Sequence, residues 1–97
     1  MALALRTTPT GYKTSTIRDA ISYALSFTTT QSGQRFSYYN NRCHEFEKQF
    51  NMSSDEFMQK FEEGNIGDDQ VYFDWYAAKQ GLDIWRERRD ILSGVIV

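Results

Sequence analysis

The spacing of apolar residues along this chain is that of helices. From Phe36 to Phe50, apolar side chains recur at intervals of three and four residues, which places them on one face of an α-helix. The run consists of Phe36, Tyr39, Cys43, Phe46 and Phe50. It predicts a helix over residues 36–50 in which Cys43 is a buried structural thiol.

A shorter helix is predicted upstream, over residues 16–27. Thr16 can serve as its N-cap, and apolar residues follow on one face at Ile17, Ile21, Ala24 and Leu25. Three successive threonines, 28–30, and a glycine at 33 predict that this helix ends near Phe27, with a linker to about Gln34. Residues 1–15 show no clear period, so we expect a flexible tail there and a single helical domain over residues 16–97.

The stretch around residue 53 carries start and stop signals for a third helix. Ser53 and Glu56 form a capping box, and Met52 and Phe57 stand in the positions of a hydrophobic staple. Gly64 suits the left-handed position after a helix end. These signals predict a short helix over residues 53–63.

The C-terminal segment is predicted to be one long helix. Gly67 or Asp68 is the expected N-cap, and apolar residues recur at spacings of four and three from Val71 to Ile96. A second apolar line contains Phe73, Ala77, Ile84 and Ile91. One packing surface cannot cover both lines, so we predict a homodimer. The expected interface residues are Gly81, Trp85 and Leu92.

Together these segments predict an all-α fold, a compact bundle of three to four helices with a long C-terminal helix. A chain of 97 residues has room for one core. The aromatic residues expected to meet in it are Phe46, Phe50, Phe57, Phe61, Phe73 and Trp75. The single cysteine and the lack of a long apolar run favour a cytoplasmic protein without a membrane span.

Negative charge is concentrated in one block, although the whole chain carries only −2. Residues 55–74 contain seven acidic side chains and one lysine. Such a block is either a solvated face or a surface that attracts a basic protein partner. For the second interpretation the predicted partner-binding residues are Met58, Glu62, Glu63, Asp68, Asp69, Tyr72 and Tyr76.

The sequence contains no recognisable catalytic motif. It has no G-x-S-x-G elbow and no phosphate-binding glycine loop. The lone histidine, His44, lacks the neighbours of a metal site. The adjacent carboxylates at 62–63 and 68–69 are explained by solvation and helix dipoles. We therefore expect no enzyme, no cofactor and no metal. The arginines of 86–89 are interleaved with acids, which disfavours a nucleic-acid surface but leaves the question open.

Residues Arg42 to Ala77 resemble a family of small prokaryotic proteins with the pattern FE-x-x-(Y/F)-x-M-(S)-x-x-x-F-x-x-x-F-x-x-G-x-(L/I)-x-D, followed by an aromatic residue and an acid–Trp pair. The matching residues are Phe46, Glu47, Phe50, Met52, Ser53, Phe57, Phe61, Gly64, Ile66, Asp68, Phe73, Asp74 and Trp75. These proteins are similar to presumed antitoxins of toxin–antitoxin pairs. The resemblance implies binding and neutralisation of a small toxin, often a nuclease.

Two other functions fit the sequence. One is a self-associating helical scaffold whose aromatic stripe serves its own dimer. The other is a transcriptional autoregulator that places Arg6, Lys13 and Arg18 on DNA phosphates. The N-terminal 35 residues depart from the family pattern, so they do not decide between these functions.

Overall fold

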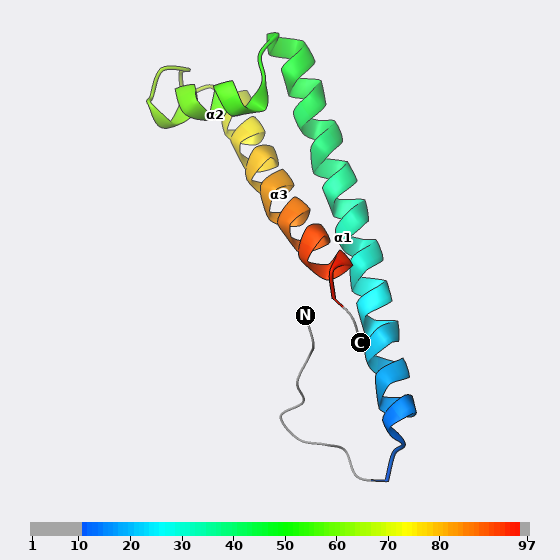
Figure 1. Cartoon of the computed structure of the whole chain (residues 1–97). Coiled ribbons are helices and arrows are strands. Elements are labelled where there is room, and N and C mark those ends of the chain that lie inside the picture. The colour runs from blue at the N-terminus through cyan, green and yellow to red at the C-terminus, as the bar shows by residue number, and fades with distance from the viewer. Residues whose placement is uncertain (1–10, 96–97) are drawn as a thin grey trace.

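The described part of the chain, residues 11–95 of a computed structural model, consists of three helices and no strand (Figure 1). They are α1 (Thr14–Phe50), α2 (Ser54–Glu62) and α3 (Gln70–Ser93). The predicted all-α class is confirmed. The start of the predicted tail, residues 1–10, and Ile96 lie outside the described residues.

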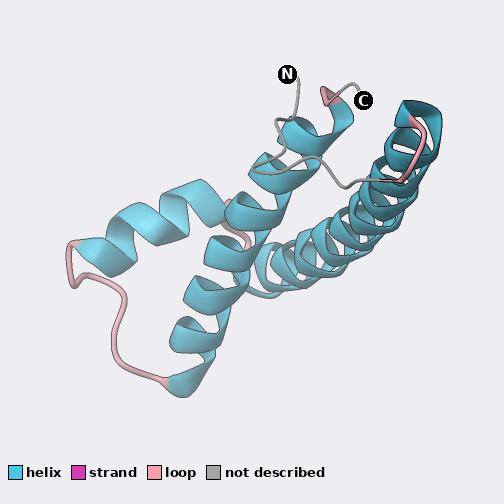
Figure 2. Cartoon of the chain, turned by 90° about the horizontal axis from the view of Figure 1, so that it is seen from below, coloured by secondary structure: helices cyan, strands magenta, loops and turns pink. Residues whose placement is uncertain are grey.

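The molecule is elongated, which corrects the predicted compact bundle. α1 and α3 run side by side in opposite directions, and α2 projects from one end of this pair (Figures 1 and 2). The extents are 61 × 22 × 20 Å, and the radius of gyration is 19.2 Å. A compact chain of this length would have a radius of gyration of about 12.5 Å. The elongation follows from α1, whose 37 residues span about 55 Å.

The predicted linker between residues 28 and 34 does not exist, because α1 is continuous through it. The inward face continues through this segment with Thr29 and Ser32, at helical spacing between Leu25 and Phe36. Ser32 is 1% exposed. The Thr28 hydroxyl donates to the Ala24 carbonyl at 3.0 Å, so its polar group is satisfied within the helix. Packing against α3 outweighs the weak helix propensity of the threonines.

A sharp corner joins α1 to α2. Asn51 ends α1 in the left-handed conformation (φ 50°), and the Met52 N–H donates to the Glu47 carbonyl at 3.2 Å. Ser53 then caps α2, because its hydroxyl accepts from the Glu56 N–H at 3.1 Å. The predicted N-cap is therefore confirmed.

The C-terminus of α2 is closed by a Schellman motif. Gly64 has φ 75°, its N–H donates to the Phe61 carbonyl, and the Asn65 N–H donates to the Lys60 carbonyl at 2.8 Å. The N-cap of α3 is Asp69 rather than Gly67 or Asp68. Gly67 has φ 102°, whereas an N-cap residue needs the extended conformation that Asp69 adopts.

The hydrophobic core lies at the α2 end of the molecule. Trp75 and Phe57 are fully buried, and their rings stack with a centroid distance of 4.0 Å. Phe46 and Phe50 also stack on Trp75, at 5.7 and 5.4 Å. Phe73 was predicted in this core, but it is 47% exposed, and its ring forms a T-shaped contact with Phe61 at a centroid distance of 5.4 Å. The buried hydrophobic residues are Cys43, Phe46, Phe57, Trp75, Ala78 and Leu82.

Candidate protein-binding site

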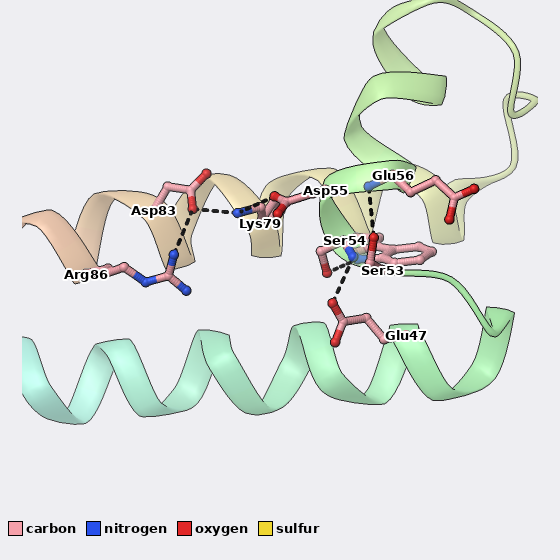
Figure 3. A network of polar contacts seen from close by, with 9 residues as sticks. Glu47, Ser53, Ser54, Asp55, Glu56, Lys79, Asp83 and Arg86 are labelled. Atoms are coloured by element: carbon pink, nitrogen blue, oxygen red, sulfur yellow. Dashed lines mark hydrogen bonds and ion pairs between the residues drawn. The ribbon is translucent and has the colours of Figure 1, made fainter.

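Ser54 connects all three helices at the base of the α2 end. The Trp75 indole N–H on α3 donates to the Ser54 hydroxyl at 2.9 Å, and the Ser54 backbone N–H donates to the Glu47 carboxylate of α1 at 2.8 Å (Figure 3). The predicted capping box therefore forms only in its Ser53 half. The Glu56 carboxylate lies 3.7 Å from the Lys60 amine instead. Glu47 supplies the carboxylate at the positive end of α2.

Lys79 ties α3 to α2 beside this serine. Its amine lies 2.7 Å from the Asp83 carboxylate and 3.2 Å from the Asp55 carboxylate, and the residue is only 8% exposed (Figure 3). Burial alone would lower the pKa of Lys79, but the hydrogen bonds to Asp83 and Asp55 outweigh it and raise that pKa. The amine is therefore a charged structural tie at neutral pH.

Cys43 lies against the same junction and has the properties of a core residue. It is 1% exposed, and burial raises the pKa of its thiol, with a smaller opposing effect of a hydrogen bond to Ser54. The thiol is thus protonated at neutral pH. This agrees with the predicted structural role.

A crevice of about 140 Å³ opens beside these three residues. Its walls carry both signs of charge, from Lys79 and Arg86 on one side and Glu47 and Asp55 on the other. Lys79 pairs with Asp55 and Arg86 pairs with Asp83, as Figure 3 shows, and the two bases balance the two acids, so the crevice has no excess charge of one sign for a ligand. Within residues 11–95, no three His, Cys, Asp or Glu side chains group as metal ligands do. No helix in that range has the length and apolarity that crossing a membrane requires.

The four predicted acidic residues lie at the same end of the molecule and are all exposed. Glu62 ends α2 and Glu63 caps it, while Asp68 and Asp69 immediately precede α3. The two aspartates suit the positive end of α3. The two glutamates lie at the negative end of α2, where a carboxylate is disfavoured. The sequence explanation by helix dipoles therefore fails for Glu62 and Glu63.

Few neighbouring groups neutralise these acids. Glu63 accepts weak hydrogen bonds from Gln59 and Asn65, both at 3.4 Å. Within the described residues, no ion pair involves Glu62, Asp68 or Asp69. Their charge is therefore free to act on a molecule outside the chain.

The three apolar residues predicted beside the acids are half-buried. Tyr76 stacks on Phe61 with centroids 4.5 Å apart, and its hydroxyl accepts from the Gln80 amide. Tyr72 lies 5.5 Å from the Phe50 ring, and Met58 packs against the core cluster. All seven predicted partner-binding residues thus lie on α2, the following loop and the first two turns of α3.

The residues predicted for the dimer face contact α1 of the same chain. An added Cβ at Gly81 would lie 2.6 Å from the Tyr39 ring, so this glycine permits close packing inside the chain. Trp85 carries the Arg35 guanidinium over its ring at 5.1 Å, and Leu92 lines a groove with α1. Self-association through these residues stays a prediction. The second apolar line, Phe73, Ala77, Ile84 and Ile91, is the exposed one, although the predicted dimer residues Trp85 and Leu92 lie on the first line.

Sequence reasoning missed the junction of Glu47, Ser54 and Lys79. The spacing of Lys79 and Asp83 is a visible signal of an ion pair on one helix. The contact of Glu47 with Ser54 crosses a corner whose geometry the sequence does not specify. Comparisons of the chain with protein-family models, curated proteins and solved structures find no match.

Proposed function

We propose that this chain is a non-catalytic protein-binding module that neutralises a small basic protein, as an antitoxin neutralises its toxin. The observation that carries the proposal is the exposed set of Glu62, Glu63, Asp68 and Asp69 on α2 and the loop after it, together with half-buried Met58 on α2 and Tyr76 near the start of α3. Carboxylates steer a basic partner, and adjacent apolar side chains provide the contacts that hold it.

The placement of the glutamates supports this function over a purely structural one. Carboxylates at the negative end of α2 cost stability, so helix formation gives no reason for Glu62 and Glu63. The loop that carries the acids is bounded by the Schellman motif at Gly64 and by the N-cap at Asp69. Binding would therefore order little additional backbone.

The resemblance of residues 42–77 to presumed antitoxins supports the same partner class. Its motif residues include the buried Phe57 and Trp75, the Ser53 cap and the Gly64 turn, all of which shape the α2 end. A basic, nuclease-like toxin has the charge that this end attracts.

The test replaces all four acids by their amides and measures binding to the product of the adjacent gene by surface plasmon resonance. At low salt we expect association to slow several-fold, with a smaller change in dissociation, because peripheral charges act mainly on encounter. At high salt the difference should shrink.

A matched control changes Asp19, Glu45 and Glu87 to amides and is compared with a variant in which only Glu62, Glu63 and Asp68 become amides. The control removes the same total charge as that variant, but from residues outside α2 and its loop, so association should change much less. Equal association of the wild type and the first variant at both ionic strengths would identify the acids as an ordinary solvated face. Equal slowing in the two triple variants would show an effect of net charge alone.

A further inference from the structure

The inward apolar stripe of α1 is longer than the helix that covers it. α1 has 37 residues and α3 has 24, so about 13 residues of α1, roughly 20 Å of helix, extend beyond α3 (Figure 1). We call residues 14–26 the α1 extension. The stripe continues along it through Leu25, Ile21 and Ile17. All three are partly exposed, and none belongs to the core cluster of the described residues.

An open groove lies where α3 ends. It has a volume of about 460 Å³ and lies between the α1 extension and the last turn of α3. Leu25 and Leu92 are among its lining residues. The other lining residues are Ser22, Ser26, Thr29, Thr30, Ser93 and Val95. Another helix could enter here and continue the path of α3 along the part of the stripe that α3 does not cover.

The apolar spacing of the α1 extension is self-complementary. Ile17 and Leu25 each lie four residues from Ile21. In an antiparallel pair of α1 extensions with Ile21 on the two-fold axis, Ile17 of each copy therefore faces Leu25 of the other. A two-fold interface requires such a reciprocal match.

The charges at the two helix ends match the same arrangement. α1 begins at Lys13 with no side-chain cap and no acid in its first turn, which is unfavourable at the positive end of a helix. The last turn of α3 contains Asp90 and no base, which is unfavourable at the negative end, and among the described residues only Arg89 of the preceding turn pairs with that carboxylate, at 3.0 Å. The antiparallel pair brings the start of α1 from one copy to the end of α3 in the other. There Lys13 meets Asp90, and the two dipoles align head to tail.

We propose that this protein forms a two-fold dimer in which the α1 extensions of two copies pair antiparallel across Ile21, and the first turn of each α1 enters the groove of the other copy. The interface lies at the end opposite the acidic residues. It is independent of the proposed partner and shares only Leu92 with the interface predicted from the sequence.

The first experiment measures mass by sedimentation velocity of the full chain at tens of micromolar. The wild type should sediment as a dimer of the 11.4 kDa chain. Ile21→Glu places two carboxylates on the axis and should raise the dimer dissociation constant at least tenfold. Tyr23→Glu is the matched control, because Tyr23 lies on the same helical turn but is 78% exposed on the opposite face. It should remain dimeric.

Two results would overturn the proposal. One is a monomeric wild type, which would mean that no second copy covers the stripe. The other is a dimer that survives Ile21→Glu but dissociates with Ile84→Glu, which would place the second copy on the exposed line of α3. Helical circular dichroism of each variant verifies that the fold is retained, since Ile21 lies outside the core.

Disulfide trapping tests the register. Ile21→Cys should cross-link with itself under mild oxidation, whereas wild-type Cys43 is buried and should not. Ile17→Cys alone should stay uncross-linked, but it should cross-link when mixed with Leu25→Cys. Self-cross-linking of Ile17→Cys would indicate parallel helices and contradict the proposal.

A charge reversal gives a second readout. Lys13→Glu should stabilise the helix α1 in the monomer, because it places an acid at the positive end of the helix. The same change should weaken the dimer several-fold at low salt, because it places that acid beside Asp90 of the other copy. An unchanged or tighter dimer would contradict the head-to-tail contact.

Discussion

Trp75 is completely buried, yet its indole carries an N–H that needs an acceptor. Ser54 provides that acceptor and is itself 5% exposed. The neighbouring Ser53 has a different task, since its hydroxyl caps α2 at the surface. The two adjacent serines therefore have different roles: Ser54 makes a buried hydrogen bond, and Ser53 caps a helix.

Alanine substitutions at these serines should differ in cost. Ser54→Ala leaves the indole N–H unpaired in the core and should destabilise the protein by about 1–3 kcal/mol. Ser53→Ala loses only the cap, at about 1 kcal/mol. Urea unfolding followed by circular dichroism measures both values, with exposed Ser37→Ala as a control expected within about 0.5 kcal/mol. A larger loss for Ser53→Ala would show that the indole finds another acceptor.

The pKa values of Cys43 and Lys79 predict how the free energy of unfolding depends on pH. Both pKa values are raised in the folded protein, so the folded state holds these protons more tightly than the unfolded chain. Their contribution is complete below the ordinary thiol pKa of 9.0 and is lost as the pH rises through the folded values. The urea midpoint should therefore fall above about pH 9, first through Cys43.

Cys43→Ala provides the control for this pH dependence. The urea midpoint of Cys43→Ala should be lower at every pH because the substitution leaves a cavity. The variant and the wild type are therefore compared by the slope of the midpoint against pH. The decline just above pH 9 should be shallower than in the wild type. Equal slopes would show that Cys43 does not cause it.

Among the helices, α2 was predictable and α1 was not, for a physical reason. The signals for α2, Ser53 and Gly64, act within a few residues, so the sequence contains them completely. The continuity of α1 depends on α3, which covers Thr29 and Ser32 from a distant part of the chain. Because Thr29 and Ser32 are polar, the helical spacing of inward positions from Leu25 to Phe36 could not be recognised from apolar residues alone. The charge of the candidate site was likewise visible in the sequence, whereas its Glu47–Ser54 support was not.

Two glycines in helices should respond oppositely to alanine. A Cβ at Gly33 of α1 would meet nothing within 4 Å, so Gly33→Ala should stabilise the protein by about 0.5–1 kcal/mol. At Gly81 of α3 the same atom would overlap the Tyr39 ring, and the resulting strain of about 1–3 kcal/mol exceeds the gain in helix propensity. Thermal melts of both variants give the signs. Stabilisation by Gly81→Ala would mean that Tyr39 moves aside at little cost.

At the scale of the whole molecule, the two ends differ in what stabilises them. The stacked rings around Trp75 and the ties at Ser54 and Lys79 all lie at the α2 end. Towards the other end the inward face contains Thr29 and Ser32, and then α3 stops. A single chain should therefore be most stable at its acidic end and least stable in the α1 extension.

Hydrogen exchange can measure this gradient along the chain. Isolated helices shorter than about 12–15 residues are marginal in water, so in monomeric Ile21→Glu the amides of residues 14–25 should exchange rapidly. Those of residues 36–50 should stay protected by the core. In the wild type at dimer-forming concentration, residues 14–25 should gain protection, and dilution should remove it. Tyr23→Glu should behave like the wild type. Strong protection of residues 14–25 in the Ile21→Glu monomer would mean that another part of the same chain covers the stripe.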